Sequence, residues 1–288
     1  MRRSLFALVF ALVLATVAAQ AQLLDEFNPP RGNCCLPGSA SALANSAKTL
    51  ADQLQDWNQL GRYHADNVNL RKQPADPKRV VFMGDSITDG WRLAEFFPGK
   101  PYVNRGIGGQ TTPQMLARMY ADVIDLKPAA MVVLAATNDI AHNTGPETAE
   151  MVQENIMAMT ELAQHHNIKV LLCSVTPISD YPFLAAQAQQ AQAGRGGQPG
   201  AGGPGGGRGM MRARQTDQRP PADILKLNAW MKDYAAKAGA IYVDYFSALV
   251  DDKGWLKDGI SADGLHPNAD GYKIMAPIVE AAIEKAVP

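Results

Sequence analysis

The chain has 288 residues, of which 47% are hydrophobic and 19% are charged. This apolar content is enough for one sizeable core or two small ones. The formal net charge of −1 gives no sign of a basic surface, so nucleic acid is not an expected partner.

The first 21 residues have the pattern of a secretory signal peptide. Arg2 and Arg3 precede an apolar run from Leu5 to Ala19, and Ala19-Gln20-Ala21 supplies the small residues of a cleavage site. A membrane anchor is the alternative, but about 15 apolar residues are short for a bilayer span. No cysteine lies beside the cleavage region, which argues against a lipoprotein. We expect cleavage after Ala21 or Ala19, a secreted or periplasmic protein, and no stable membrane insertion afterwards.

Export makes the three cysteines relevant, because disulfides persist in oxidising compartments. Cys34 and Cys35 are adjacent in a turn bounded by proline and glycine, whereas Cys173 lies in an apolar run and is predicted to be a buried strand residue. An odd number does not support a disulfide framework. Cys34 and Cys35 are therefore free or locally oxidised, or one of them pairs with another molecule. No metal-ligand spacing is present, and no metal or cofactor is expected.

Residues 22–77 precede the main domain. Residues 22–40 are rich in Pro, Gly and Asn and are predicted to form an extended arm. Residues 41–70 carry apolar side chains at spacings of three, four and seven, which predicts an amphipathic helix or helix pair packed on the main domain. These side chains are Leu43, Leu50, Leu54, Trp57, Leu60 and Tyr63.

From residue 78 to residue 288, short apolar runs alternate with helical patterns. This alternation predicts one α/β domain with a central parallel five-stranded sheet that is covered on both faces. The expected strands are 79–83, 101–104, 130–135, 168–175 and 240–243, and the expected helices lie near 111–121, 146–166, 222–238 and 268–285.

Residues 185–219 interrupt this rhythm with an Ala/Gln run and a glycine-rich tract. Ten glycines occur among the sixteen residues from Gly194 to Gly209, so the tract cannot bury enough apolar area to order itself. We predict a flexible, solvated surface insertion. Its five arginines (Arg195, Arg208, Arg212, Arg214 and Arg219) leave two alternatives open, RNA binding and attachment to an anionic glycan or cell surface. Export favours the second over the first.

Several residues of chemical interest follow the expected strands or precede the last helix. The positions are Ser86, Gly106-Ile107-Gly108-Gly109, Thr137-Asn138-Asp139 and Asp263-Gly264-Leu265-His266-Pro267. In an α/β sheet, catalytic groups gather outside the carboxyl ends of the strands. A hydroxyl, a glycine backbone, a carboxamide, a carboxylate and an imidazole would then share one edge, which is the set that acyl transfer requires.

Each member of the set has a defined task. Ser86 is a weak nucleophile unless a base removes its proton, and the unperturbed pKa of about 6.5 suits His266 to that task. Asp263, three residues earlier, can accept the other ring N–H and stabilise the imidazolium. Backbone N–H groups of Ser86 and Gly109 and the side-chain N–H of Asn138 can form an oxyanion hole.

Each segment alone also has an ordinary structural explanation. Gly-Asp-Ser can be a strand end with a turn, and Asp263 or Asn268 can be a helix cap. The Gly106–Gly109 segment could imitate a phosphate-binding loop, but it is not GxGxxG and no lysine follows it. The occurrence of all four segments, in order and each at an element boundary, favours catalysis.

The four segments resemble the sequence blocks of the SGNH (GDSL-type) hydrolases. The matching residues are Gly84-Asp85-Ser86-Ile87, Asn104-x-Gly106-Ile107-Gly108-Gly109-x-Thr111-Thr112, Thr137-Asn138-Asp139 and Asp263-x-x-His266. The second block is most similar to the branch that holds the platelet-activating-factor acetylhydrolase catalytic subunits and bacterial lysophospholipase-like esterases. The resemblance spans residues 78 to about 285, without the glycine-rich insertion.

This resemblance implies a flavodoxin-like three-layer α/β/α fold and metal-free ester hydrolysis through an acyl-serine. It implies Ser86 as nucleophile, Asp263 and His266 as the rest of the triad, and Ser86, Gly109 and Asn138 as the oxyanion hole. Two positions depart from the family pattern. Ile87 replaces a leucine conservatively, and Ala136 stands where glycine is usual, at some cost if that position needs a positive φ.

The expected function is a secreted serine ester hydrolase that cleaves carboxylic, short-chain acyl esters of a small molecule or polysaccharide. Deacetylation of an acetylated polysaccharide, lysophospholipase activity and thioesterase activity are the alternatives within the enzyme class. A catalytically silent module that binds a glycan or a surface is the alternative outside it. Acyl length, the alcohol and the oligomeric state do not follow from the sequence.

Overall fold

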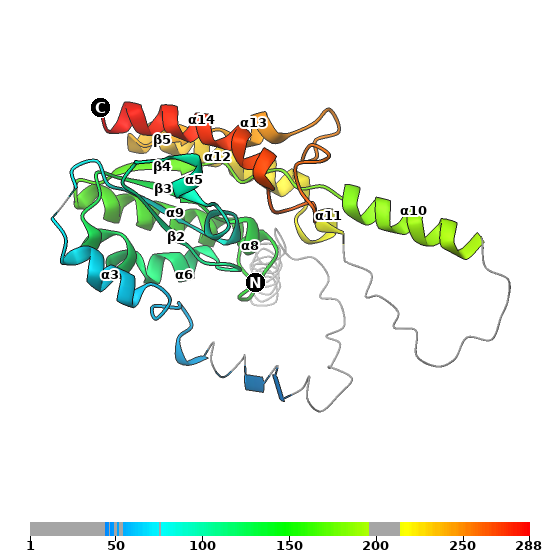
Figure 1. Cartoon of the computed structure of the whole chain (residues 1–288), viewed down its shortest axis with the longest axis horizontal. Coiled ribbons are helices and arrows are strands. Elements are labelled where there is room, and N and C mark those ends of the chain that lie inside the picture. Colours follow the sequence, from blue (N-terminus) through cyan, green and yellow to red (C-terminus); the bar gives the residue numbers. More distant parts are fainter. Residues whose placement is uncertain (1–43, 46, 49–50, 52–53, 75, 196–213) are drawn as a thin grey trace, which may run out of the picture.

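The computed structural model describes residues 44–45, 47–48, 51, 54–74, 76–195 and 214–288 (Figure 1). The predicted signal peptide, the extended arm with Cys34 and Cys35, and the centre of the glycine-rich tract lie outside the described residues. No helix within the described ranges is long and apolar enough to cross a membrane.

Five parallel strands form one sheet in the order β2-β1-β3-β4-β5, as predicted. Their apolar side chains alternate between two cores. In β1, Val81 and Met83 join one core, whereas Val80 and Phe82 join the other. This alternation is the period of a strand that is buried on both faces. The strands are β1 (Val80–Gly84), β2 (Tyr102–Gly106), β3 (Ala130–Leu134), β4 (Lys169–Cys173) and β5 (Ile241–Val243).

Helices cover both faces, so the expected three-layer α/β/α arrangement is confirmed. The core shared with α6, α9 and α12 lies on one face, and the core shared with α13 and α14 lies on the other. Figure 1 shows α13 and α14 above the sheet and α6 and α9 below it. The helices on the first face are α6 (Thr112–Ala117), α7 (Met119–Asp122), η1 (Ile124–Leu126), α9 (Ala149–His165) and α12 (Pro221–Ala238), and those on the second are α5 (Leu93–Phe96), α13 (Tyr245–Leu249) and α14 (Ala269–Ala286).

The remaining described helices are short or lie at the margins of the domain. They are α3 (His64–Arg71), α4 (Ser86–Asp89), α8 (Thr137–Ile140), α10 (Tyr181–Arg195) and α11 (Gln215–Gln218). Of these, α4 and α8 each begin within three residues of the end of a strand. They therefore stand at the carboxyl edge of the sheet.

The prediction that the apolar side chains of residues 41–70 pack on the main domain is wrong for Leu54, Trp57 and Leu60, and Leu43 and Leu50 lie outside the described residues. Leu54 is 83% exposed, Trp57 44% and Leu60 41%. The segment is held to the domain by its backbone instead, because Gln110 and Gln114 donate side-chain hydrogen bonds to the carbonyl groups of Asn58 and Trp57.

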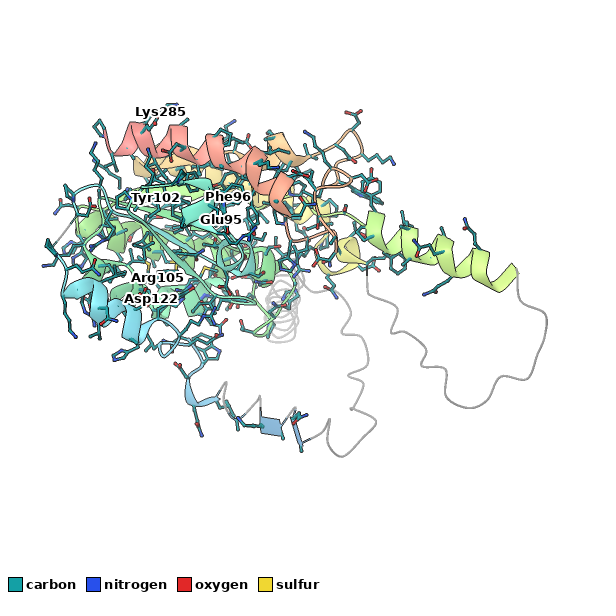
Figure 2. All side chains as sticks on the ribbon, viewed as in Figure 1. Glu95, Phe96, Tyr102, Arg105, Asp122 and Lys285 are labelled. Carbon is teal, nitrogen blue, oxygen red and sulfur yellow. The ribbon has the colours of Figure 1, made fainter. Side chains whose placement is uncertain are left out.

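The helix that does follow, α3, is attached mainly through polar contacts. Tyr63 donates a hydrogen bond to the carbonyl of Gly106, and Arg105 pairs with Asp66. The one buried side chain of α3 is Asn67, which donates to Asp122 at 2.6 Å. Figure 2 shows Arg105 and Asp122 on the α3 side of the sheet and Phe96 and Tyr102 on the opposite side.

Both described ends of the predicted insertion form helices. Residues 185–195 continue the helix α10, which projects from the body of the domain (Figure 1). After the undescribed tract, Arg214 leads into α11, and Arg219 is only 4% exposed. Arg219 therefore belongs to the packed domain and not to a solvated loop.

The prediction for Cys173 is confirmed. Its thiol is free and buried at the end of β4. Burial raises the pKa of this thiol to about 12, so it stays protonated and inert at neutral pH.

Candidate active site

Ser86 lies at the sharp turn from β1 into α4. Asp85 caps this helix, since its Oδ1 accepts a hydrogen bond from the N–H of Ile87 at 2.9 Å. Gly84 permits the turn because a Cβ there would stand 2.1 Å from Thr88 Oγ1. β1 therefore ends at Gly84, Asp85 caps the helix that follows, and Ser86 is the first residue of that helix.

Asp263 and His266 lie in the turn before α14. One carboxylate oxygen of Asp263 accepts the backbone N–H groups of Leu265 and His266 at 3.0 and 2.9 Å, and the other lies 2.7 Å from His266 Nδ1. The cap of α14 is Asn268, whose Oδ1 accepts from Asp270 and Gly271. Asp263 is thus committed to the histidine and is not a helix cap.

The histidine connects this turn to the serine. His266 Nε2 lies 2.8 Å from Ser86 Oγ, across 180 positions of the chain. A carboxylate only accepts hydrogen bonds, so Asp263 fixes the proton on Nδ1 and leaves Nε2 to accept the serine O–H. The three side chains form one unbroken chain of hydrogen bonds, which we call the relay.

The charges within the relay support one another. The hydrogen bond that His266 Nδ1 donates to Asp263 raises the pKa of His266 above 6.5, despite partial burial, which acts in the opposite direction. Burial alone would raise the pKa of Asp263, but the hydrogen bonds from the His266 side chain and backbone outweigh it and hold that pKa well below its usual range. Asp263 therefore stays ionised whenever His266 is protonated.

The two other expected residues lie at the same edge of the sheet. Asn138 follows β3 in α8, and its Nδ2 donates to the carbonyl of Gln110 at 3.1 Å. Gly109 has a φ of +79°, and the preceding Gly108 lies beside Ser86, because a Cβ on Gly108 would be 3.8 Å from that of Ser86. The glycine loop and the carboxamide thus flank the serine from two neighbouring strands.

Ala136 does occupy a left-handed backbone position. Its φ is +85° and it is fully buried before α8. A non-glycine residue in this region carries strain of about 1–2 kcal/mol. The strain is local, since Asn138 still makes its hydrogen bond to Gln110.

The aspartates beside the expected site residues hold the surrounding loops by hydrogen bonds. Asp139 accepts hydrogen bonds from the backbone and the hydroxyl of Thr112, which joins α8 to the start of α6. Asp85, in addition to its capping bond, is fully buried, and burial raises the pKa of its carboxyl to about 6. Trp91 is a core residue that stacks on Tyr272 with ring centroids 5.1 Å apart.

Arg219 and Gln110 were missed in the sequence. Arg219 donates to the carbonyl and hydroxyl oxygens of Thr137 at 3.0 and 3.1 Å, and to Asn138 Oδ1 at 3.3 Å. Its predicted place among the solvated arginines of the insertion is wrong, because its side chain is buried. The available signal was its position directly before Pro220-Pro221, where a helix begins.

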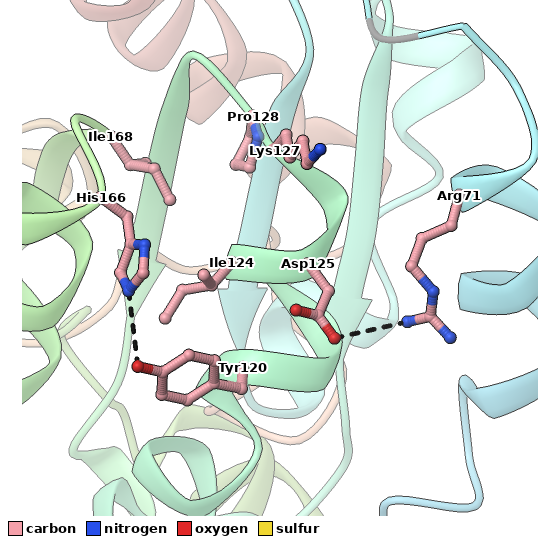
Figure 3. Close-up of a pocket in the computed structure, with 8 residues that line it drawn as sticks. All are labelled: Arg71, Tyr120, Ile124, Asp125, Lys127, Pro128, His166 and Ile168. Atoms are coloured by element: carbon pink, nitrogen blue, oxygen red, sulfur yellow. Dashed lines mark hydrogen bonds and ion pairs between the residues drawn. The ribbon is translucent and has the colours of Figure 1, made fainter.

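A cavity elsewhere in the molecule contains none of the expected site residues. Pro128 and Ile168, which precede β3 and β4, lie on its wall, so it is at the opposite edge of the sheet from the relay (Figure 3). The hydroxyl of Tyr120 lies 3.4 Å from His166 Nε2, and Arg71 pairs with Asp125 at 3.7 Å (Figure 3). Within the described ranges, His, Cys, Asp and Glu side chains form no group of three that could hold a metal ion.

The GDSL-like lipase/acylhydrolase family model matches residues 82–274, which include the whole relay. The chain belongs to this family. A GDSL-like lipase from Bacteroides thetaiotaomicron has the same fold, with 35% identity, a TM-score of 0.65, and coverage of 80% of this chain and 98% of that one.

Two curated proteins are similar over shorter stretches. The uncharacterized lipoprotein YqeF of Bacillus subtilis is 31% identical over 118 residues, and the esterase TesA of Pseudomonas aeruginosa is 30% identical over 120 residues. These matches cover 34% and 37% of this chain, and 49% and 58% of the two relatives. The chain thus spans about half the length of the curated relatives that it matches.

Glycine at position 136 should be tolerated better than glycine at the neighbouring position 135. Both alanines are buried, but only Ala136 has a positive φ, so Ala136→Gly relieves strain while it removes a methyl group. We expect Ala135→Gly to lower the free energy of unfolding by about 1–2 kcal/mol more than Ala136→Gly does. Urea denaturation of both variants measures this difference, and equal losses would contradict the strain.

Proposed function

We propose that this protein is an exported serine ester hydrolase that cleaves short-chain acyl esters. The unbroken hydrogen-bonded relay from Ser86 through His266 to Asp263 carries the proposal. Membership of the acylhydrolase family and the similarity to an esterase support it. The signal-peptide pattern of residues 1–21 supports export.

The reaction begins when Ser86 Oγ attacks the carbonyl carbon of the ester. The serine proton moves to His266 Nε2 as the bond forms, and the ionised Asp263 stabilises the resulting imidazolium. The carbonyl oxygen becomes an oxyanion that receives hydrogen bonds from the backbone N–H groups of Ser86 and Gly109 and from Asn138 Nδ2. A single donor of this kind contributes about 10²–10³ in kcat.

The tetrahedral intermediate then collapses. The bond to the alcohol breaks, the alcohol leaves with the proton from His266, and the acyl group remains on Ser86 Oγ. Water attacks this acyl-serine while His266 takes one of its protons, and a second collapse releases the carboxylic acid and restores the serine O–H. No redox step or further reactant is needed.

The surroundings of Ser86 favour a short acyl group. The space beneath α4 is filled, since Ile87 is 1% and Trp91 2% exposed. A long acyl chain would therefore have to lie across the surface around the serine. That surface is polar, because Asp89 accepts from the Gly108 N–H and Asn143 donates to the Gly109 carbonyl.

The same polar surroundings favour a hydrophilic alcohol, so a carbohydrate deacetylase is the second candidate. Lysophospholipase or thioesterase action would instead need apolar surface for a long chain or a carrier. A catalytically silent binding module would not require a serine 2.8 Å from a histidine that is itself hydrogen-bonded to a carboxylate. Release of acetate from acetylated xylan, compared with release from p-nitrophenyl acetate, separates the carbohydrate deacetylase from a general esterase.

Removal of the serine hydroxyl should abolish the reaction. We expect Ser86→Ala to lower kcat for p-nitrophenyl acetate by at least about 10⁴-fold, because the nucleophile is lost while the fold is kept. Ser247→Ala is the matched control, since Ser247 is exposed in the first turn of α13 and its hydroxyl donates to Asp244, the cap of that helix. A fluorophosphonate should label the parent and Ser247→Ala but not Ser86→Ala. Activity or labelling that survives in Ser86→Ala would sink the proposal.

The rate should fall on acidification as His266 takes up a proton. Because Asp263 raises the pKa of His266, the unprotonated base is lost as the pH falls through a value above 6.5. We expect kcat/KM for p-nitrophenyl acetate, measured from about pH 4 to about pH 9, to have its acid midpoint above 6.5. Full recovery on return to neutral pH serves as the control for unfolding. A flat profile would rule out His266 as the base.

The rate should also depend on acyl length. We expect kcat/KM for p-nitrophenyl octanoate to be at least about tenfold lower than for the acetate, because the packed residues below Ser86 leave no room for the chain. Both esters are used below their aggregation limits, and the butyrate serves as an intermediate point. An equal or higher rate with the octanoate would contradict the short-chain assignment.

A further inference from the structure

We infer that Arg219 is a positioning residue that orients and polarises the Asn138 carboxamide, the side-chain donor of the proposed oxyanion hole. This inference rests on the function proposed above. It concerns a residue that follows the glycine-rich tract, far in sequence from the blocks that identify the family.

The guanidinium of Arg219 is buried between two segments of the site. Its Nε donates to both oxygens of Thr137, and its Nη2 donates to Asn138 Oδ1 at 3.3 Å. Its Nη1 donates to the side chains of Gln215 and Gln218 at 3.0 and 3.2 Å. All three guanidinium nitrogens therefore donate hydrogen bonds, and two of them donate to Thr137 and Asn138, in the segment that carries the carboxamide.

These contacts decide which way the carboxamide faces. A guanidinium has no acceptor, so the Asn138 atom that faces Arg219 must be the oxygen. The Nδ2 on the other side donates one proton to the carbonyl of Gln110 at 3.1 Å. Since the amide group is planar, fixing the oxygen and one N–H also fixes the direction of the second N–H, which is the one available to an oxyanion.

The partner on the other side is itself held firmly. Gln110 is fully buried, its Oε1 accepts from Arg118 Nε at 2.6 Å, and its Nε2 donates to the carbonyl of Asn58. Arg118 also donates to the carbonyl of Gly84, at the end of β1. The carboxamide is thus clamped between two buried arginine networks.

The charge of Arg219 adds to the effect of its geometry. A cation beside the amide oxygen draws electron density from the nitrogen, which makes the second N–H a stronger donor to a developing negative charge. Burial lowers the pKa of Arg219, whereas the carboxylates of Asp85 and Asp263 favour its charged form. An arginine keeps its charge under such conditions.

The same charge acts on His266. Asp263, in its own turn, and Asp85, at the cap of α4, raise the pKa of His266, whereas Arg219 lowers it. Removal of the Arg219 charge should therefore move the acid limb of the rate profile to higher pH. A purely structural role would leave that midpoint in place.

The helix before Arg219 extends the contact to the relay. Gln215 donates to the backbone carbonyl of Asp263 at 3.3 Å, and Thr216 donates to Asp180 through its backbone and its hydroxyl. The short segment of α11 and Arg219 therefore touches both the carboxamide segment and the turn that carries His266. It lies directly after the tract that interrupts the domain.

A double-mutant cycle between Arg219 and Asn138 tests the inference. We expect Arg219→Gln to lower kcat for p-nitrophenyl acetate by about 10- to 100-fold, with KM changed by less than about threefold, because an oxyanion contact is made only in the transition state. In the Asn138→Ala background the same substitution should change kcat by less than about threefold. Arg219→Lys, which keeps the charge but not the fork, should be intermediate.

Arg214→Gln is the matched control. Arg214 is exposed, lies over the Phe183 ring and begins the same helix, so its loss removes one positive charge without touching Asn138. We expect its kcat and acid midpoint to equal those of the parent, whereas Arg219→Gln should have a midpoint at higher pH. Thermal unfolding reports whether each variant folds. If Arg219→Gln does not fold, Arg219→Lys replaces it in the double-mutant cycle with Asn138→Ala.

Equal losses of kcat in the parent and Asn138→Ala backgrounds would overturn the inference, and so would an unchanged kcat in Arg219→Gln. Failure of the proposed function gives a different result. If Ser86→Ala keeps its activity, the site itself is misassigned. If Ser86→Ala is inactive while Arg219→Gln equals the parent, only the role of Arg219 is rejected.

Discussion

The hydrogen bond between Ser86 and His266 is the contact on which the proposed function of this molecule depends. It joins the end of the first strand to the turn before the last helix, across almost the whole domain. The strands β1, β2 and β3 are parallel and paired in register, so their carboxyl ends lie at one edge of the sheet. The serine, the glycine loop and the carboxamide are each the next residues along three neighbouring strands.

The last helix must be held in place for that hydrogen bond to persist. Tyr272 in α14 donates to the carbonyl of Ile87 at 2.7 Å, and its ring stacks on Trp91. Both contacts fasten α14 to the segment that begins with Ser86. The aromatic residues after the serine therefore act on the site by packing, which aligns His266 with Ser86, whereas polar loops form the surface around Ser86.

The sequence alone was sufficient to predict the elements and site residues that depend on local patterns. Apolar runs located all five strands, and the order of four short segments located Ser86, Asp263 and His266, which the structure brings into one relay. It was insufficient where a contact between residues far apart in the sequence determines whether a side chain is buried or exposed. Pro220 and Pro221 mark a helix start after Arg219, but no local pattern shows that Arg219 is buried whereas Arg214 is exposed. Helical spacing likewise cannot show that Trp57 is attached by its carbonyl instead of its ring. Ala136 could be questioned from the sequence, but its positive φ required the backbone.

The most direct test of this account is to find the acyl group on the enzyme. The protein is mixed with p-nitrophenyl acetate, quenched in acid within the first turnovers, digested and analysed by mass spectrometry. The account predicts one acetyl group on the peptide that contains Ser86, located at the serine itself and absent in Ser86→Ala. Acetate release at the normal rate with no acetylated serine at any time point, or an acetyl group on another residue, would contradict it.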